Sequence, residues 1–173
     1  NVVHAKTDMY HRWIQSQVDA FICVSKRVYD AQIIDDIAHK YHLVYNGVNT
    51  QRFPEIVSES ISTSPFIVGY AGRIIENKGI FELLDAIRMI HSETDDIQLV
   101  LVGDGKPADI ERMHQYIAKH TMQDYVQYVG FQKDMNRFYR SIHCLVAPSK
   151  VQEAFGLVLC EAMYCKVPVI TST

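Results

Sequence analysis

The chain has 173 residues, of which 48% are apolar and 21% are charged, a composition that is ordinary for a soluble α/β protein. This length accommodates one domain with a substantial core, or one domain together with part of another. The formal net charge of -3 provides no basic field, so nucleic acid is not expected as a partner. No apolar run approaches the length of a membrane-spanning helix, and no signal-peptide pattern is present.

Neither the cysteines nor the histidines have the spacing of a metal site or a disulfide framework. No two cysteines form a CxxC pair and three of them have apolar neighbours, so we expect buried, reduced thiols in a cytosolic protein. His39 and His42 have no third ligand nearby and are expected at the surface. No Asp-x-Asp triplet occurs, so no metal held against a diphosphate is predicted. The four cysteines are Cys23, Cys144, Cys160 and Cys165.

The first 49 residues carry the pattern of a partial domain. In chain order the predicted elements are the end of a helix at 1–16, a buried strand at 18–24, a helix at 26–40 and a second strand at 42–45. Ser25 is placed to cap the second helix, and Asn46-Gly47 after the second strand is a turn signal. Because the chain begins inside a helix and without Met, we expect residues 1–49 to be the remnant of a larger domain.

Beyond this region a linker leads into a regular alternation of strands and helices. Residues 50–64 contain Pro54, four serines and few patterned apolar residues, as expected of an interdomain linker. The alternation over residues 65–173 predicts a mostly parallel, doubly wound sheet, which ends without its closing helix. The predicted strands are 66–71, 97–102, 125–129, 144–147 and 167–170, and the predicted helices are 79–90, 107–120, 135–142 and 154–164.

Two of the loops expected at the carboxyl edge of this sheet, where such sheets bind ligands, contain glycine and charged residues. In the loop from Gly72 to Gly79, the glycines permit tight turns, and Arg73 and Lys78 add positive charges suited to phosphate oxygens. The alternative for these two basic residues is a solvated loop without a ligand. In the loop around Gly103, the glycines either form a simple turn or give a ligand room to approach.

A third loop, from Pro148 into the helix predicted at 154–164, is the most informative. Glu153 is expected at the mouth of that helix and Glu161 two turns inside it, roughly 12 Å away at 1.5 Å per residue. The free amides of the first turn suit a phosphate, and the carboxylates could accept hydroxyls on either side of it. The helix dipole alone also explains Glu153. Glu161 has apolar neighbours and needs a partner, for which Arg73 or a ligand hydroxyl would serve.

With these loops in order, the chain from about Val44 onward resembles the retaining GT-B-fold glycosyltransferases of family GT4 (glycosyl transferases group 1) and their relatives. This resemblance implies a Rossmann-like, nucleotide-sugar donor-binding domain at 65–173, and in residues 1–49 the remnant of the N-terminal, acceptor-side domain. The motifs that carry it are Asn46-Gly47-Val48-Asn49, Gly72-Arg73, Glu76-Asn77-Lys78-Gly79, Val102-Gly103-Asp104-Gly105, Val129-Gly130, Pro148-Ser149, Glu153-x7-Glu161 and Pro168-Val169-Ile170.

The resemblance also implies a role for individual residues. Arg73 and Lys78 would bind the donor diphosphate and stabilise the charge that builds on the leaving nucleotide. Glu161 would accept the ribose hydroxyls, and Glu153 would hold the donor hexose. The implied catalytic residues are Arg73, Lys78 and Glu153. The implied donor-binding set is Gly72, Arg73, Lys78, Gly103, Phe131 and Gln132 beside the nucleobase, Ser149, Glu153, the backbone at Ala154, Phe155 and Gly156, Leu157, and Glu161.

The implied reaction is metal-independent transfer of a hexosyl group from a nucleotide-diphosphate sugar, with retention at the anomeric carbon and no cofactor. Its implied partners are the donor and an acceptor glycan, lipid or small molecule bound through the missing N-terminal domain. The implied location is cytoplasmic, compatible with peripheral association at the inner face of a membrane. Two residues depart from the family pattern: Ala154 replaces a common glycine, and Lys166 replaces another at a left-handed helix cap, at a cost of about 1 kcal/mol.

Two other functions fit the same residues. A nucleotide-sugar epimerase of this fold would isomerise the hexose without an acceptor, and a non-catalytic module would bind the nucleotide sugar without turnover. The sequence leaves the nucleotide base, the hexose, the acceptor and the linkage unassigned. We expect the 173-residue chain alone to lack turnover, because a cleft between two domains would lack one wall.

Overall fold

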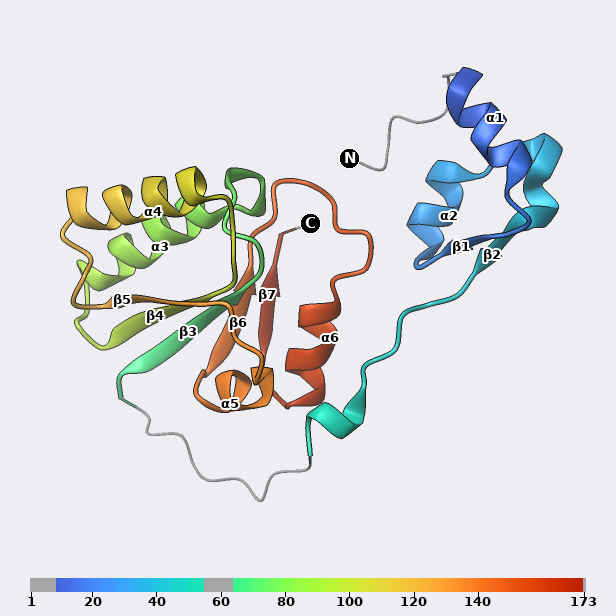
Figure 1. Ribbon diagram of the computed structural model, residues 1–173. Helices are drawn as coiled ribbons and strands as arrows, with labels where there is room; N and C mark the ends of the chain where they lie inside the picture. The colour runs from blue at the N-terminus through green and yellow to red at the C-terminus, as the bar shows by residue number, and fades with distance from the viewer. Residues whose placement is uncertain (1–8, 55–63, 173) are drawn as a thin grey trace. The chain divides into compact units, whose positions relative to one another are not determined.

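The computed structural model describes residues 9–54 and 64–172, with side chains from Trp13 onward. These residues form two compact units. The first consists of residues up to Val48 together with Glu153–Leu157, and the second consists of Asn49–Gln152 and the residues from Val158 onward. Figure 1 shows the elements of both units.

The first unit is built on a parallel pair of short strands. Tyr41 stacks on Phe21 across the pair, with ring centroids 4.7 Å apart, and is buried. The Lys40 ammonium donates to the backbone oxygens of Ser16 and Val18 at 3.2 and 2.8 Å, which satisfies one carbonyl in the last turn of the first helix and one just after it. The elements of this unit are α1 (Met9–Gln17), β1 (Phe21–Cys23), α2 (Lys26–Gln32), the 3-10 helix η1 (Asp35–Lys40) and β2 (Tyr41–Leu43).

Two local predictions in this unit are wrong, and both strands are shorter than predicted. The single helix predicted over 26–40 is broken into α2 and η1 because Ile33 and Ile34 have extended backbone, a conformation that β-branched residues favour. The turn predicted at Asn46-Gly47 is absent, and the backbone there has no regular structure. The predicted cap at Ser25 is confirmed, since its side chain accepts the backbone N–H of Val28 at 3.2 Å.

The second unit contains the doubly wound parallel sheet that the alternation predicted. Its strand order is β5-β4-β3-β6-β7, and every neighbouring pair is parallel. The chain runs outward from the central strand β3 to β4 and β5, then returns to add β6 and β7 on the other side. The order therefore reverses between β3 and β6. The strands are β3 (Phe66–Ala71), β4 (Ile97–Val102), β5 (Val126–Gly130), β6 (Cys144–Ala147) and β7 (Val169–Thr171).

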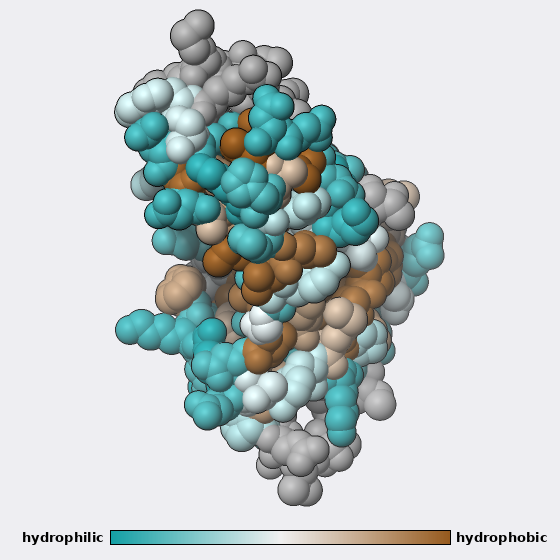
Figure 2. Space-filling view, turned by 90° about the vertical axis from the view of Figure 1, so that its right-hand side faces the viewer, coloured by the Kyte–Doolittle hydropathy of each residue, from teal (hydrophilic) through white to brown (hydrophobic). Residues whose placement is uncertain are grey.

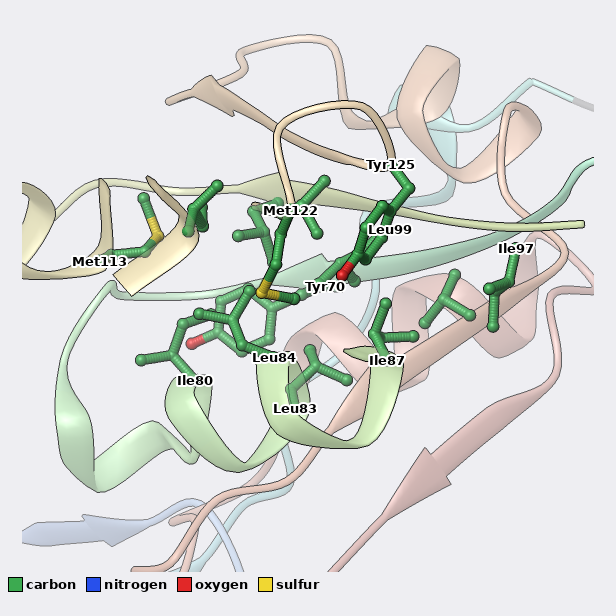
Figure 3. Packing of buried hydrophobic residues seen from close by; sticks show 14 of the residues in the cluster. Tyr70, Ile80, Leu83, Leu84, Ile87, Ile97, Leu99, Met113, Met122 and Tyr125 are labelled. Carbon is green, nitrogen blue, oxygen red and sulfur yellow. The ribbon is translucent and has the colours of Figure 1, made fainter. Parts of the chain in front are cut away.

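Helices cover both faces of this sheet, with α3 and α4 on one face and α5 and α6 on the other (Figure 1). On the α3/α4 face, apolar side chains of α3 such as Leu84 pack with Leu99 and Met113 in a buried cluster (Figure 3). On the opposite face, a Cβ added at Gly69 would overlap the side chains of Ile142 and Phe138, so α5 packs closely against β3. The helices are η2 (Thr50–Arg52), η3 (Glu76–Lys78), α3 (Ile80–His91), α4 (Pro107–Lys119), α5 (Met135–Arg140) and α6 (Leu157–Tyr164).

The start of α6 is the main error in the predicted elements. The helix begins at Leu157 rather than Ala154, because Gly156 has a φ of +82° and a right-handed helix cannot continue through that conformation. Glu153 therefore lies four residues before the helix, and Glu161 lies in its second turn. The separation of roughly 12 Å along one helix does not apply to these two carboxylates. The left-handed conformation expected at Lys166 is confirmed, with a φ of +61°.

The remaining expectations about thiols and histidines hold in part. All four cysteines are free, but only Cys23 and Cys144 are buried, while Cys160 and Cys165 are half-buried. His39 and His42 are exposed, as expected. Within the described part of the chain, no helix combines the length and apolar character needed to cross a membrane. Figure 2 shows apolar side chains interspersed with hydrophilic ones on the face that it views.

Candidate functional site

The candidate site lies at the carboxyl edge of the second unit's sheet, around the point where the strand order reverses. In open parallel sheets such a reversal leaves a crevice between the loops that follow the two diverging strands. Here those loops follow β3 and β6, which are hydrogen-bonded neighbours with Val68 opposite Cys144. The loop after β4 lies on the other side of β3.

The loop after β3 has a backbone fixed by three hydrogen bonds. The Tyr70 hydroxyl donates to the carbonyl oxygen of Arg73 at 2.7 Å. The N–H groups of Gly72 and Ile74 donate to Val102 and Asp104 at 3.0 and 2.8 Å. The Arg73 side chain is exposed. A rigid loop therefore presents this guanidinium at the sheet edge, where a phosphate could accept from it.

Gly103 lets the loop after β4 contact the loop after β3. Its φ is +147°, and an added Cβ would overlap the carbonyl oxygen of Gly72. Its N–H donates to Gly130 at 3.0 Å, and its carbonyl oxygen accepts the Tyr128 hydroxyl at 3.0 Å. The glycine is thus required by the packing of one loop on another. The sequence offered two explanations for this glycine, a simple turn and room for a ligand, and contact between two loops was neither of them.

The loop after β6 is linked to the loop after β3 through Lys150. Its backbone N–H donates to Asn77 at 2.9 Å, and its ammonium lies 2.5 Å from Glu82 and 3.8 Å from Glu76. Arg112 of α4 also donates to Glu76, at 2.6 Å. This hydrogen bond, together with the positive charges of Arg112 and Lys150, lowers the pKa of the Glu76 carboxyl. Both sides of the strand reversal are therefore joined by a charged network.

Glu161 is the one charged side chain buried among the described residues, with 7% of its surface exposed. Its partner is Tyr139 of α5, whose hydroxyl donates to Glu161 Oε2 at 3.0 Å. The sequence indicated that this carboxylate needs a partner, but proposed Arg73 or a ligand hydroxyl and missed Tyr139. The need for a donor on α5 could have been inferred, because α5 precedes β6 and α6 follows it, and right-handed crossovers place both helices on the same face of the sheet. The pattern of α5 alone does not show which residue faces Glu161.

The other predicted residues are spread over both units. Lys78 is half-buried in η3, and Phe131 is 68% exposed just after β5. The Gln132 amide donates to the carbonyl oxygen of Val129 in β5 at 2.8 Å, and the Ser149 hydroxyl donates to that of Val151 in its own loop at 2.7 Å, so both groups have nearby backbone partners. Residues 153–157, including the exposed Glu153, belong to the first unit, whereas Arg73, Lys78 and Glu161 belong to the second. Within the described residues, no cluster of three or more His, Cys, Asp or Glu side chains could hold a metal ion.

Comparison with known proteins identifies the family. Residues 51–173, well over half of the chain, match the family model described as glycosyl transferases group 1. The chain belongs to this family. The fold agrees, because the five-stranded parallel sheet with helices on both faces is that of GT-B glycosyltransferase structures.

Several known members of the glycosyltransferase group are similar to the chain. It is 28% identical over 94% of its length to the uncharacterized glycosyltransferase MJ1178 of Methanocaldococcus jannaschii, and spans 42% of that protein. It is 33% identical over 65% of its length to the lipopolysaccharide 1,2-N-acetylglucosaminetransferase of Salmonella typhimurium, and spans 32% of it. The chain thus spans less than half the length of these relatives.

A solved structure resembles the chain over most of its length. Anabaena Alr3699/HepE in complex with UDP has a TM-score of 0.75 and 25% identity over 89% of the chain and 44% of that protein. The same protein in complex with UDP-glucose has a TM-score of 0.80 over 99% of the chain and 51% of HepE, at 22% identity.

Proposed function

We propose that residues 65–173 bind a nucleoside-diphosphate sugar and serve as the donor half of a retaining, metal-independent hexosyltransferase. The observation that supports this most is the convergence of three loops at the carboxyl edge of the sheet, two of them on either side of the strand reversal and joined through Lys150. This is the place where open parallel sheets bind ligands. The binding of UDP and UDP-glucose by HepE, a protein of similar fold, supports a nucleotide sugar as the ligand.

In this proposal the positive charges of the loop after β3 act on the diphosphate. Arg73 and Lys78 stabilise the negative charge that develops as the bond between hexose and nucleotide breaks. Such stabilisation is strongest when the charged groups are already oriented, because no reorganisation is then needed in the transition state. The three hydrogen bonds that hold the backbone around Arg73 support this role.

Two carboxylates bind hydroxyls of the donor in this proposal. Glu161 accepts from the ribose, and Glu153 accepts from the hexose with the help of backbone amides at Ala154, Phe155 and Gly156. Carboxylate oxygens suit this role because they are acceptors only and form strong hydrogen bonds with hydroxyl donors. The nucleobase contacts the backbone after β5, at Phe131 and Gln132.

The donor site is tested by isothermal titration calorimetry of the chain with UDP, GDP and ADP. The site variant combines Arg73→Ala with Glu161→Ala. A matched control combines Arg88→Ala with Glu93→Ala. It also removes one arginine and one glutamate, but Arg88 lies in the last turn of α3 and Glu93 is an exposed residue just after that helix. Circular dichroism establishes that each protein is folded.

We expect one nucleotide to bind the unaltered chain and the control, and the site variant to lose at least about tenfold in affinity, as the removal of charge-assisted hydrogen bonds implies. If a folded chain bound none of the three nucleotides, or if the site variant bound as tightly as the control, the proposed donor site would be wrong.

Transfer is distinguished from the two other functions by product analysis with a nucleotide sugar. Consumption of donor that depends on an added acceptor supports a transferase, whereas isomerisation of the hexose alone supports an epimerase. Binding without turnover in a protein that also carries the acceptor-side domain supports a binding module. For the 173-residue chain itself we expect binding without turnover, and measurable transfer by it would contradict this expectation.

A further inference from the structure

The ring of Tyr139 is held in place by aromatic neighbours on the α5/α6 face of the sheet. Its side chain is fully buried. Phe53, which follows η2, packs against Tyr139 with ring centroids 5.9 Å apart and against Tyr164 of α6 at 6.4 Å. The ring of Phe138, the preceding residue of α5, lies 5.5 Å from that of Tyr139 between centroids. The hydroxyl at the end of this ring therefore has little freedom to move.

That hydroxyl donates to Glu161 in preference to the other acceptor within reach. The oxygen lies 3.0 Å from Glu161 Oε2 and 3.3 Å from the carbonyl oxygen of Val158. A phenol has one hydrogen, and a carboxylate accepts it more strongly than an amide carbonyl does. Burial, with the negative charge of Glu161 and this hydrogen bond, raises the pKa of Tyr139 far above its usual range. Tyr139 therefore stays protonated, and a donor to Glu161, at neutral pH.

We infer that Tyr139 is a positioning residue that orients the carboxylate of Glu161 toward the ribose of the bound nucleotide and so determines the preference for ribonucleotides. This inference rests on the proposed function, in which Glu161 accepts the ribose hydroxyls. A carboxylate has two oxygens that can each accept about two hydrogen bonds. With one oxygen bound by a fixed phenol, the plane of the carboxylate is set, and its remaining acceptor positions have a fixed direction.

The alternative is a purely structural pair that joins α5 to α6. Loss of such a pair would weaken the fold and reduce the affinity for every nucleotide alike. Loss of an orienting group would instead reduce the affinity for ligands that carry the ribose 2′-hydroxyl, and would change the affinity for ligands without it much less. The two are separated by comparing UDP with 2′-deoxy-UDP, which lacks the 2′-hydroxyl of the ribose and keeps the 3′-hydroxyl.

The experiment measures the ribose preference, defined as the ratio of the dissociation constants for 2′-deoxy-UDP and UDP, by calorimetry on the chain. Tyr139→Phe keeps the ring and its contacts with Phe53 and Phe138 and removes only the hydroxyl. We expect its affinity for UDP to fall roughly tenfold and its affinity for 2′-deoxy-UDP to change less than about twofold. Glu161→Gln, which keeps the size of the side chain, should abolish most of the ribose preference by itself.

Tyr116→Phe is the matched control, because it removes another hydrogen bond from a tyrosine to a carboxylate in the same sheet unit. The Tyr116 hydroxyl of α4 donates to Asp85 of α3 at 2.5 Å, on the opposite face of the sheet from Tyr139. We expect this variant to keep the unaltered affinity for both nucleotides. In the double variant Tyr139→Phe, Glu161→Gln, the loss of ribose preference should not exceed that of Glu161→Gln alone, since one residue acts through the other.

Each outcome has a definite meaning. Equal losses for UDP and 2′-deoxy-UDP in Tyr139→Phe would reduce the pair to a structural contact and overturn the inference, while leaving the donor site in place. A ribose preference that Glu161→Gln does not change would refute the role of Glu161 in the proposed function, and the role of Tyr139 with it. Selective loss for UDP in Tyr139→Phe, absent from Tyr116→Phe, supports both.

Discussion

The two faces of the sheet in the second unit are stabilised in different ways. On the α3/α4 face, long helices lie over a cluster in which every buried side chain is apolar or aromatic. One polar contact there, between Tyr116 and Asp85, lies at the margin, with about half of the Asp85 side chain exposed. On the α5/α6 face the helices have six and eight residues, and a carboxylate and a phenol are buried between them.

This difference separates a face that stabilises the fold from a face that also holds a chemical group. Burying an ionised carboxylate is unfavourable unless a donor compensates for its lost hydration. An apolar residue in place of Glu161 would avoid that requirement altogether, so stability alone does not explain the glutamate. The α5/α6 face is therefore where substitutions should change ligand binding, and the α3/α4 face is where they should change stability only.

The sharpest test of this comparison replaces one fully buried leucine on each face. Leu99 of β4 lies opposite Val68 in the α3/α4 cluster, and Leu145 of β6 lies opposite Gly69, against which α5 packs. Leu99→Ala and Leu145→Ala should each lower the free energy of unfolding by about 3–4 kcal/mol, measured by urea denaturation. Where both remain folded, we expect nucleotide affinity to fall in Leu145→Ala and to be unchanged in Leu99→Ala. Equal affinities in the two variants would contradict the division between the faces.

The same division explains how much of the fold the sequence could predict. The strands β3, β4 and β6 have the predicted bounds, and α3 and α4 agree to within one residue. In these elements, local propensity and apolar spacing agree with burial, so the pattern is sufficient. The predicted start of α6 is wrong because Glu153-Ala154-Phe155 is compatible with a helix. The true start depends on the conformation of Gly156, which the apolar spacing does not encode.

The candidate site could be predicted less completely than the fold. The loops after β3, β4 and β6 were expected at one edge, and the structure brings them together there. Tyr139 and Lys150 were missed because their partners are set by how two helices or two loops pack, and not by spacing along the chain. The roles assigned to Arg73, Lys78 and Glu153 remain predictions until a nucleotide is titrated.

A second, smaller effect on stability is expected where one helix on each face ends with a non-glycine residue in the left-handed conformation. Thr121 after α4 and Lys166 after α6 have φ values of +54° and +61°. In each case the next N–H donates five residues back, from Met122 to Ile117 and from Val167 to Ala162. Glycine is the residue usually found at this position. Lys166→Gly should raise the free energy of unfolding by about 1 kcal/mol and Thr121→Gly by up to about 2 kcal/mol, since a β-branched residue is the more strained.

The control for this pair is Ser92→Gly, because Ser92 ends α3 with a right-handed φ of -69°. Glycine relieves no strain there and should not stabilise the protein. Urea denaturation gives the free energy of unfolding of the three variants. A similar increase in Ser92→Gly would mean that relief of left-handed strain does not cause the stabilisation. None of the three changes should alter the ribose preference.

The smallest expected effect concerns the hydrogen bond between Tyr116 and Asp85 on the α3/α4 face, and how its contribution to stability depends on pH. The hydrogen bond from Tyr116, with a lesser contribution from Arg88, lowers the pKa of the Asp85 carboxyl. A carboxyl with a lowered pKa in the folded state contributes stability above its unfolded pKa of about 4, and this contribution is lost as the pH falls below that value. Because Asp85 is half exposed, the contribution should be less than about 1 kcal/mol.

Urea denaturation at pH 7 and at pH 2.5 tests this contribution. The unaltered chain should be more stable than Tyr116→Phe at pH 7, and the difference should shrink toward pH 2.5, because protonation of Asp85 weakens the hydrogen bond that it accepts from Tyr116. A difference that stays constant would mean that the hydroxyl of Tyr116 stabilises the fold by packing and not by binding a carboxylate. Nucleotide affinity should be the same in both proteins at pH 7, because this pair belongs to the face that only stabilises the sheet.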